Sequence, residues 1–458
     1  MPFNTWIFSI FFIVTLLVYI ALRPTKFWLL WLLLASYFFY GWLNPLYLIL
    51  IGYSTLVTFI SGMMIGNTEK RKLWLGICIT NSLLLLGFFK YAAFVAENIN
   101  RLFEVLNVTA SIPKPGFLLP IGISFYTFIS MGYIIDVYRG KISAERNIVK
   151  LASFISFFPY LLAGPIERAQ NILPQFNTPP TINRDNITEG FSLFIVGLFK
   201  KIALADFLAL YVNKVYGDPS QFQSPALLLA TYAFAWQIYF DFSGYTDMAR
   251  GVARMMGFKL MLNFNNPYLS TSLGEFWGRW HISLSTWFKD YLYIPLGGNR
   301  HGHFNTYRNM IITMLVAGLW HGAAWNFVIW GALHALGRSI TRDLERTKIY
   351  SERVPKIAKQ FLIFHIVCLS WIFFRAETFG KAMTVLKGIF SCSLTDPKFS
   401  ITALLFMGCI LLYQFIYESN FRRILELSAV KVILMLSMIL YMVFFRTSGY
   451  EIFLYFRF

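Results

Sequence analysis

Two histidines lie inside hydrophobic sequence, 40 residues apart, and each directly follows a tryptophan. His281 lies in EFWGRWHISLSTWF and His321 in MLVAGLWHGAAWNF. An ionisable side chain at membrane depth costs free energy and is retained mainly where it functions. Histidine is also the side chain best suited to move a proton near neutral pH. The pair therefore predicts acid–base chemistry inside a membrane, although residue types alone support a packing role for each histidine equally well.

The composition is that of a membrane protein. Hydrophobic residues make up 57% of the 458 residues and charged residues 14%, and the mean hydropathy is +0.57. A soluble chain of this length needs far more polar surface. Apolar runs recur along the whole chain, and long uninterrupted runs in a bilayer mean helices. The net charge of +18 comes from short basic clusters between these runs. This is the pattern of cytoplasmic loops, and it predicts no nucleic-acid partner.

The apolar runs predict about 11 transmembrane helices. The clearest lie at about 6–22, 27–42, 46–65, 73–89, 117–135, 310–336, 361–374, 402–416 and 429–445, with shorter or interrupted runs at 151–166, 191–212 and 226–240. Lys200 and Lys201 interrupt one run and suggest a helix end at the membrane interface. Basic residues follow the first, third and fifth spans, which predicts an extracytoplasmic N-terminus.

Segment 274–300 mixes aromatic and charged side chains, too polar for a lipid-facing span and too aromatic for an ordinary loop. We interpret it as a buried or re-entrant segment. His321 is expected inside a helix, on the same side as Trp325 and Val328. Gly318 and Gly322 flank it and would let a neighbouring helix or a ligand approach closely.

The familiar signatures of other enzyme classes are absent from the sequence. The chain has no GxSxG, HExxH, P-loop or GxGxxG motif. His301 and His303 are too close in sequence to share one helix face, and no carboxylate is beside them, so no metal site is predicted. His334 and His365 also lie in apolar runs, and we interpret both as packing histidines.

Several longer segments carry a resemblance to a known family. They are LPIGISFYTF at 119–128, DVYRG at 136–140, FFPYLLAGPIER at 157–168, QIYFDFSGYTDMARG at 237–251, the block at 263–300, GLWHGAAWNFVIWGALH at 318–334 and the C-terminal EIFLYFRF. On these segments the chain resembles the membrane-bound O-acyltransferases, within them most closely the bacterial alginate O-acetyltransferase branch. One departure is Gly278, where the pattern FWRRWH leads us to expect a bulky or basic residue.

The resemblance implies an all-α polytopic fold, a bundle of transmembrane helices with re-entrant and interfacial helices around a central tunnel. We expect one integral-membrane domain over 1–458: N-terminal spans at 1–145, a catalytic core with both motif histidines at 146–340 and C-terminal spans at 341–458. The resemblance also implies that His321 is the near-invariant active-site histidine and His281 the second polar residue. Further candidates for the tunnel are Trp280, Arg279, Trp320, Asp290, Asn299, Asp241 and Tyr239.

The function expected is O-acetyl transfer across the cytoplasmic (inner) membrane of a bacterium. Acetyl-CoA is the expected co-substrate, and no permanently bound cofactor or metal is expected. His321 acts as general base, and His281 orients the acceptor or stabilises the oxyanion. Since coenzyme A stays inside the cell, the acetyl group passes to an extracytoplasmic acetyltransferase partner and from it to a polysaccharide.

Two alternatives remain open at this stage. One is transfer of D-alanine or another acyl group from a carrier protein. The other is a transporter or channel in which Asp241 and Asp247 relay protons.

Overall fold

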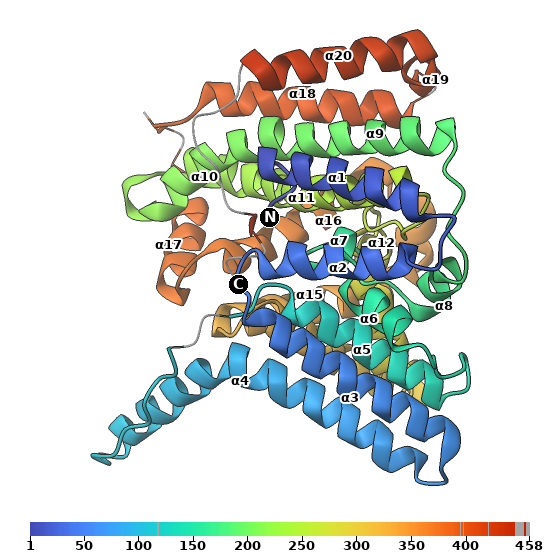
Figure 1. The fold of residues 1–458 in the computed structure, drawn as a ribbon. Coiled ribbons are helices and arrows are strands. Elements are labelled where there is room, and N and C mark those ends of the chain that lie inside the picture. The colour runs from blue at the N-terminus through green and yellow to red at the C-terminus, as the bar shows by residue number, and fades with distance from the viewer. Residues whose placement is uncertain (117–118, 394, 397, 420, 445–452, 455–458) are drawn as a thin grey trace.

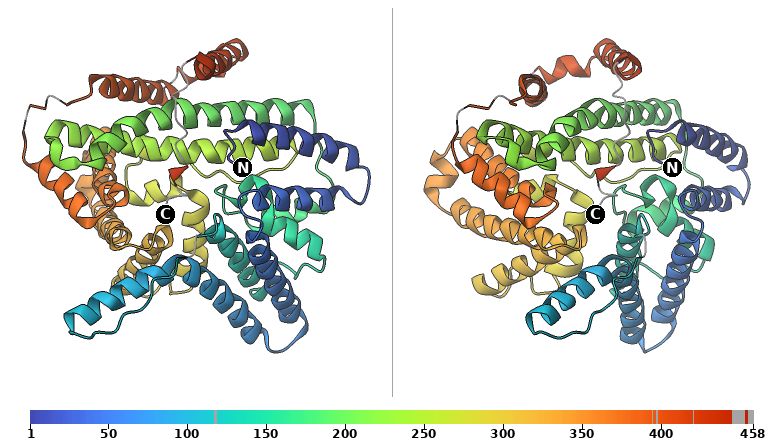
Figure 2. Two further views of the ribbon diagram at one scale, coloured as in Figure 1. Left: turned by 60° about the vertical axis from the view of Figure 1, so that its left-hand side comes forward. Right: turned by 90° about the vertical axis from the view of Figure 1, so that its left-hand side faces the viewer.

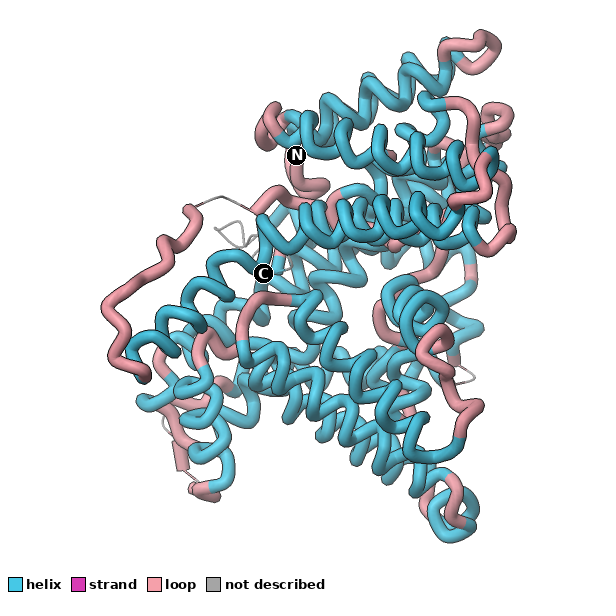
Figure 3. Tube along the Cα trace, turned by 90° about the horizontal axis from the view of Figure 1, so that it is seen from below, coloured by secondary structure: helices cyan, strands magenta, loops and turns pink. Residues whose placement is uncertain are grey.

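The computed structural model describes residues 1–116, 119–393, 395–396, 398–419, 421–444 and 453–454, and within them it contains helices and loops but no strand (Figure 3). The helices are α1 (Trp6–Leu22), α2 (Trp28–Gly41), α3 (Tyr47–Asn67), α4 (Arg71–Val105), α5 (Ile123–Tyr138), α6 (Ile148–Ser156), α7 (Phe158–Leu161), α8 (Ala169–Ile172), α9 (Arg184–Phe199), α10 (Asp206–Gly217), α11 (Ser224–Met255), α12 (Leu273–Arg279), α13 (Ile282–Phe288), α14 (Gly302–His321), α15 (Trp325–Glu345), α16 (Lys356–Arg375), α17 (Phe379–Phe390), α18 (Ile401–Glu418), α19 (Arg422–Glu426) and α20 (Ser428–Phe444). The all-helical prediction is confirmed for the part of the chain that these ranges cover.

Most predicted spans match a helix, and the first has the predicted bounds. Among the described residues, three helices are long and apolar enough to cross a membrane by length and composition: α3, α4 and α16. Five shorter apolar helices accompany them, namely α1, α2, α5, α18 and α20. The predicted total of about 11 spans stays a prediction. Residues 117–118, at the start of the predicted fifth span, and residue 445, at the end of the last, lie outside the described residues.

The predicted helix end at Lys200 and Lys201 is wrong. The chain stays helical from α9 through a π-helical turn at Lys200–Ala205 into α10. Both ammonium groups are paired with carboxylates: Lys200 lies 2.7 Å from Asp247, and Lys201 lies 2.8 Å from Asp241. A lysine inside an apolar run ends a helix only when it must reach water. Here partners on α11 make that unnecessary.

Glycines bring α9 and α11 into close contact. A Cβ on Gly197 would come within 2.5 Å of the carbonyl oxygen of Gly244, and one on Gly190 within 2.7 Å of the carbonyl oxygen of Gly251. Small residues at such crossings are how membrane helices pack without bulky side chains. Figure 1 shows α11 in the middle of the molecule, with α18 and α20 stacked outside α9 at one edge.

Three basic loops predicted to be cytoplasmic meet other segments at one end of the bundle. Arg23 donates a hydrogen bond to the carbonyl of Pro180, and Arg71 donates one to the carbonyl of Tyr138, 2.9 Å away. Arg139 also reaches the carbonyl of Asp290 at 3.1 Å. We call this end, which holds the loops after α1, α3 and α5, the basic end. Figure 2 shows α4 rising from it and bending, with the apex of the bend towards the middle of the molecule.

Candidate active site

His321 is the last residue of α14, and the helix stops there because the chain turns back. The backbone is extended at Gly322 and Ala324, and α15 begins at Trp325. The prediction of one span over 310–336 is therefore wrong. The apolar run continues through the turn, so hydropathy does not reveal it. The expectation that His321 shares a helix face with Trp325 fails for the same reason.

Glycines let the two helices of this hairpin approach. A Cβ on Gly318 would lie 2.2 Å from the carbonyl oxygen of Phe327, and one on Gly331 would lie 2.4 Å from that of Met314. A Cβ on Gly322 would lie 2.0 Å from the Phe327 ring. The space at Gly318 and Gly322 is thus filled by α15 and not by a ligand, which decides between the two possibilities that the sequence left open.

The imidazole of His321 is walled by aromatic rings. Ring centroids lie 5.0 Å away for Trp320, 5.0 Å for Trp330 and 5.3 Å for Phe374. The residue is 4% exposed. Burial favours a neutral imidazole, the form that can accept a proton.

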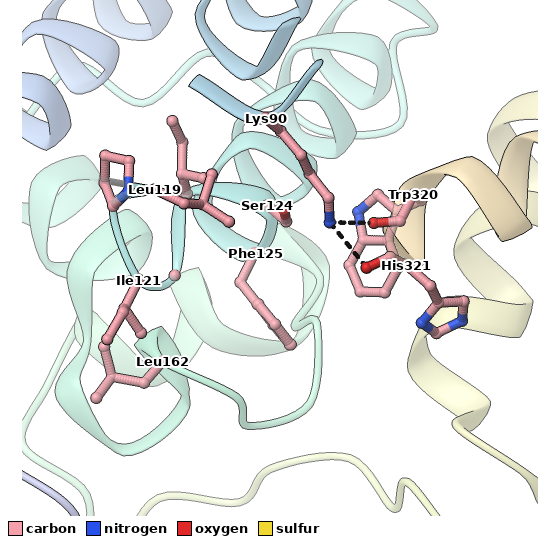
Figure 4. Close-up of a pocket in the computed structure, with 11 residues that line it drawn as sticks. Lys90, Leu119, Ile121, Ser124, Phe125, Leu162, Trp320 and His321 are labelled. Carbon is pink, nitrogen blue, oxygen red and sulfur yellow. Dashed lines mark hydrogen bonds between the residues drawn. The ribbon is translucent and has the colours of Figure 1, made fainter. Parts of the chain in front are cut away.

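Lys90 of α4 holds the end of α14, a feature that the sequence analysis missed. Its ammonium donates hydrogen bonds to the backbone carbonyls of Trp320 and His321, the latter at 3.1 Å (Figure 4). The hydroxyl of Tyr91 donates to the carbonyl of Leu319 at 2.7 Å. The last carbonyls of a helix lack intrahelical partners and carry partial negative charge, so a partly buried cation is stabilising there. One signal in the sequence could have revealed this role: Lys90 comes directly after residue 89, where the fourth span was predicted to end.

His281 lies between α12 and α13 with its backbone in the left-handed region, at φ 42° and ψ 54°. Two backbone bonds hold this turn: Asn265 N donates to Arg279 O and Ile282 N to Asn263 O, both at 2.9 Å. The ring nitrogen Nδ1 lies 3.2 Å from Oδ1 of Asn263. The segment is a set of short helices, and the predicted burial holds for one face of α12 and α13 but not for the π-helical turn at Lys289–Tyr293.

The tertiary structure brings the two histidines together around one indole. The Trp320 ring lies 6.1 Å from the ring of His281 and 5.0 Å from that of His321, centroid to centroid. Of the seven further candidates, Trp320 packs its ring against both histidines in the described part of the chain.

Three other predicted tunnel residues lie in the packed interior. Tyr239 and Trp280 are buried, with ring centroids 6.4 Å apart, and Trp280 also packs on Trp371 at 5.1 Å. Asp241 is paired with Lys201, and its second oxygen accepts the backbone N–H of Leu454 at 2.7 Å. The partners of Asp241 are those of a structural ion pair that also binds the backbone of Leu454.

The remaining three candidates have other partners or line a cavity. Arg279 pairs with Glu275 at 2.7 Å, and Asp290 pairs with Arg168 at 3.2 Å. Asn299 lines the large cavity described next. None of the three contacts either histidine in the hydrogen bonds and ion pairs of the described residues.

A cavity of about 680 Å³ lies between the α12–α13 segment and the α14–α15 hairpin. Apolar side chains such as Leu284, Phe288 and Met314 line much of it, and it reaches Ala317, one turn of α14 before His321. Four cationic side chains also line it: Lys289, Arg300, Arg338 and Arg342. Gly278, the departure from the family pattern, lines it too, and a Cβ there would meet nothing within 4 Å.

A second, small cavity of about 60 Å³ has Trp320 and His321 in its lining (Figure 4). Its lining includes Lys90, Ser124, Trp320 and the turn at Gly122. Gly122 precedes the start of α5, and α5 ends at the basic end. The helix of 16 residues is about 24 Å long, so this cavity and the basic end lie towards opposite ends of α5.

Comparisons with known proteins identify the family. The family model of the membrane-bound O-acyltransferases (MBOAT) matches residues 120–343, which contain both histidines. The chain is 42% identical over 400 residues to the probable alginate O-acetylase AlgI of Azotobacter vinelandii, covering 85% of this chain and 78% of that protein. The chain belongs to the MBOAT family. The predicted family and the predicted branch are thereby confirmed, and the protein is a multi-pass membrane O-acyltransferase.

Other MBOAT relatives act on different polymers. The peptidoglycan O-acetyltransferase of Helicobacter pylori is 36% identical over 394 residues, covering 79% of this chain and 73% of that protein. The teichoic acid D-alanyltransferase of Streptococcus thermophilus is 30% identical over 283 residues, covering 56% of this chain and 68% of that protein. The family therefore includes proteins named for different acyl groups and different acceptors.

Proposed function

We propose that this MBOAT protein transfers acetyl groups from cytoplasmic acetyl-CoA to an extracytoplasmic acceptor, with His321 as the general base. The observation that carries the proposal is the large cavity: it has four cationic side chains and extends to within one helical turn of His321. The relatives named for O-acetylation support the acetyl group.

The chemistry of the large cavity suits a coenzyme A thioester. Guanidinium and ammonium groups bind phosphates through charge-assisted hydrogen bonds. The apolar side chains suit the uncharged arm that carries the thioester. Lys289 lines the cavity next to Asp290, whose carbonyl accepts a bond from Arg139 of the basic end. Because basic loops face the cytoplasm, this position supports a cytoplasmic donor and an extracytoplasmic N-terminus in a bacterial inner membrane.

The small cavity offers a route for the acceptor from the opposite end. It touches the backbone of His321 and lies near the start of α5, away from the basic end. A donor and an acceptor that approach from opposite sides would meet at the histidine pair. Such an arrangement suits transfer to a partner acetyltransferase outside the cell, which then acetylates a polysaccharide.

Each step of the transfer then has a group to perform it. His321 removes the proton of the acceptor hydroxyl as its oxygen attacks the thioester carbonyl. The tetrahedral oxyanion collapses, the carbon–sulfur bond breaks, and the thiolate of coenzyme A takes the proton back from the imidazolium. Holding both substrates in line supplies much of the acceleration. General-base catalysis adds roughly 10²–10⁴-fold.

Binding of the donor to the purified protein in detergent tests the proposal. Wild type should bind acetyl-CoA by calorimetry without any partner. Arg338→Gln combined with Arg342→Gln should raise KM for acetyl-CoA at least about tenfold, because bonds to charged groups contribute roughly 1.5–3 kcal/mol each. Arg101→Gln is the matched control, since Arg101 pairs with Glu97 on an exposed arm of α4 and should leave KM unchanged.

Two experimental outcomes would contradict the proposal and favour a different function. Binding of an acylated carrier protein in place of acetyl-CoA would assign the chain to carrier-dependent transfer, the activity for which the D-alanyltransferase relative is named. Ion or solute flux through the protein in vesicles, without any acyl transfer, would favour a transporter.

A further inference from the structure

A chain of buried hydrogen bonds surrounds His281. Oδ1 of Asn263 lies 3.2 Å from Nδ1 of His281, 2.9 Å from Oγ of Ser283 and 3.3 Å from N of Ser283. Oγ of Ser283 in turn lies 3.0 Å from the backbone N of Ile166. Asn263, His281 and Ser283 are each 0% exposed, so water does not replace these bonds.

The fixed donors in this chain decide where its protons lie. A backbone N–H can only donate, so the Asn263 atom that faces Ser283 N must be the amide oxygen. Ser283 Oγ accepts a hydrogen bond from Ile166 N–H and has two possible acceptors for its own proton, Oδ1 of Asn263 at 2.9 Å and Nδ1 of His281 at 3.4 Å. The shorter contact directs that proton towards Asn263. Since the oxygen of Asn263 accepts from every neighbour, Nδ1 of His281 must carry a proton to bond to it.

The backbone of His281 is held as firmly as its ring. A non-glycine residue at φ 42° is strained, and such strain persists only where the surroundings over-determine it. The bonds between segments 263–265 and 279–282 do so here, and Asn263 takes part in them through its own carbonyl. The same residue thus fixes both the backbone and the ring of His281.

We propose that Asn263 is a positioning residue that holds His281 as the Nδ1–H tautomer, with the lone pair on Nε2. The role that this tautomer gives His281 in catalysis rests on the proposed acyl transfer. A neutral imidazole with an unprotonated Nε2 can accept a hydrogen bond at this atom from the acceptor hydroxyl, but it cannot donate one from it to an oxyanion. Of the two roles that the sequence leaves open for His281, the network selects orientation of the acceptor.

Nitrogen NMR of the protein labelled with ¹⁵N-histidine reads the tautomer directly. The chain has six histidines, and loss of one signal in His281→Gln assigns the resonance. Wild type at neutral pH should show His281 protonated at Nδ1 and unprotonated at Nε2. Asn263→Leu should lose that preference. A wild-type spectrum with the proton on Nε2, or a spectrum unchanged in Asn263→Leu, would overturn the proposal whether or not the protein transfers acetyl groups.

Kinetics separate positioning from mere stability. Asn263→Leu should lower kcat roughly 10–100-fold per folded protein, as loss of a residue that orients a functional side chain does, with KM for acetyl-CoA unchanged. Asn263→Asp keeps the acceptor oxygen and should retain more activity and the Nδ1–H signal. Asn186→Leu is the matched control, because Asn186 is a buried asparagine that bonds the carbonyl of Thr181, at the start of α9.

That control should lower stability but leave kcat and the His281 signal as in wild type. Equal kcat losses per folded protein in Asn263→Leu and Asn186→Leu would reduce Asn263 to a structural role and overturn the proposal.

Discussion

Both motif histidines pack against aromatic rings, with Phe242 4.6 Å from the ring of His281, but the chain around each one is held differently. His281 lies in a strained turn, and its ring is bonded to the polar side chain of Asn263. The imidazole of His321 packs among indole and phenyl rings, and the polar contact from Lys90 goes to its backbone carbonyl. A ring nitrogen bonded to a fixed acceptor keeps its proton, and in His281 that nitrogen is Nδ1. The contrast suits an orienting residue at 281 and a proton acceptor at 321.

A third buried histidine shows what a packing role looks like here. His334 of α15 is 0% exposed, and its Nε2 lies 2.9 Å from the hydroxyl of Ser370 on α16. Its ring packs on Trp277 and Trp330, with centroids 5.1 Å and 4.7 Å away. Its partners link two helices, and no part of it lines either cavity near His321. Burial in aromatic surroundings therefore does not by itself mark a catalytic histidine.

The largest expected effect is that of His321→Gln, which should reduce acetyl transfer by roughly 10²–10⁴-fold because the proton acceptor is lost. Glutamine keeps the volume between the aromatic rings better than alanine, so the melting temperature in detergent should stay close to that of wild type. Transfer is measured with radiolabelled acetyl-CoA in membranes at matched expression. Normal transfer by this variant would remove the distinction between the two histidines.

His281→Ala should cost less activity than His321→Gln in the same assay. Water can replace part of an orienting hydrogen bond, but it does not replace a positioned base. KM for the acceptor should rise while KM for acetyl-CoA stays near the wild-type value. If His281→Ala were the more damaging of the two, the roles assigned to the pair would have to be exchanged.

Lys90→Met sharpens the comparison because it leaves both imidazoles in place. Loss of the bonds to the Trp320 and His321 carbonyls should loosen the end of α14 and lower kcat about tenfold, since small misplacements of catalytic groups are costly. Lys90→Arg keeps the charge and should recover part of the activity. A Lys90→Met protein with wild-type kcat would mean that Tyr91 and the glycine contacts suffice to hold the helix end.

The smallest effect on transfer is expected for His334→Ala. Its loss leaves the Ser370 hydroxyl without its imidazole partner and opens space between rings, which should lower stability by roughly 1–3 kcal/mol. Transfer per folded protein should remain near wild type. A loss of kcat that exceeds the loss of folded protein would bring His334 into the site.

Hydrophobicity and motifs were enough to predict much of this protein. Apolar runs predicted the helices, and the first helix has the predicted bounds. The reason is that a segment in lipid must form the hydrogen bonds of its backbone groups within itself. The segment motifs predicted the family and the branch, which the relatives confirm. They also singled out His281 and His321, which the fold places around one indole.

Tertiary contacts decided the rest, since hydropathy does not distinguish burial in lipid from burial in protein. The apolar run at 310–336 predicts one span. In the structure, Gly318 and Gly331 allow α15 to fold back on α14, and His321 therefore lies at a helix end. Lys200 and Lys201 predict a helix end. In the structure, Asp247, far along the chain, pairs with Lys200, and Asp206, about one turn further along, pairs with Lys201. Lys90 and Asn263 act on residues far along the chain or across a turn, so their roles exist only once the helices have packed.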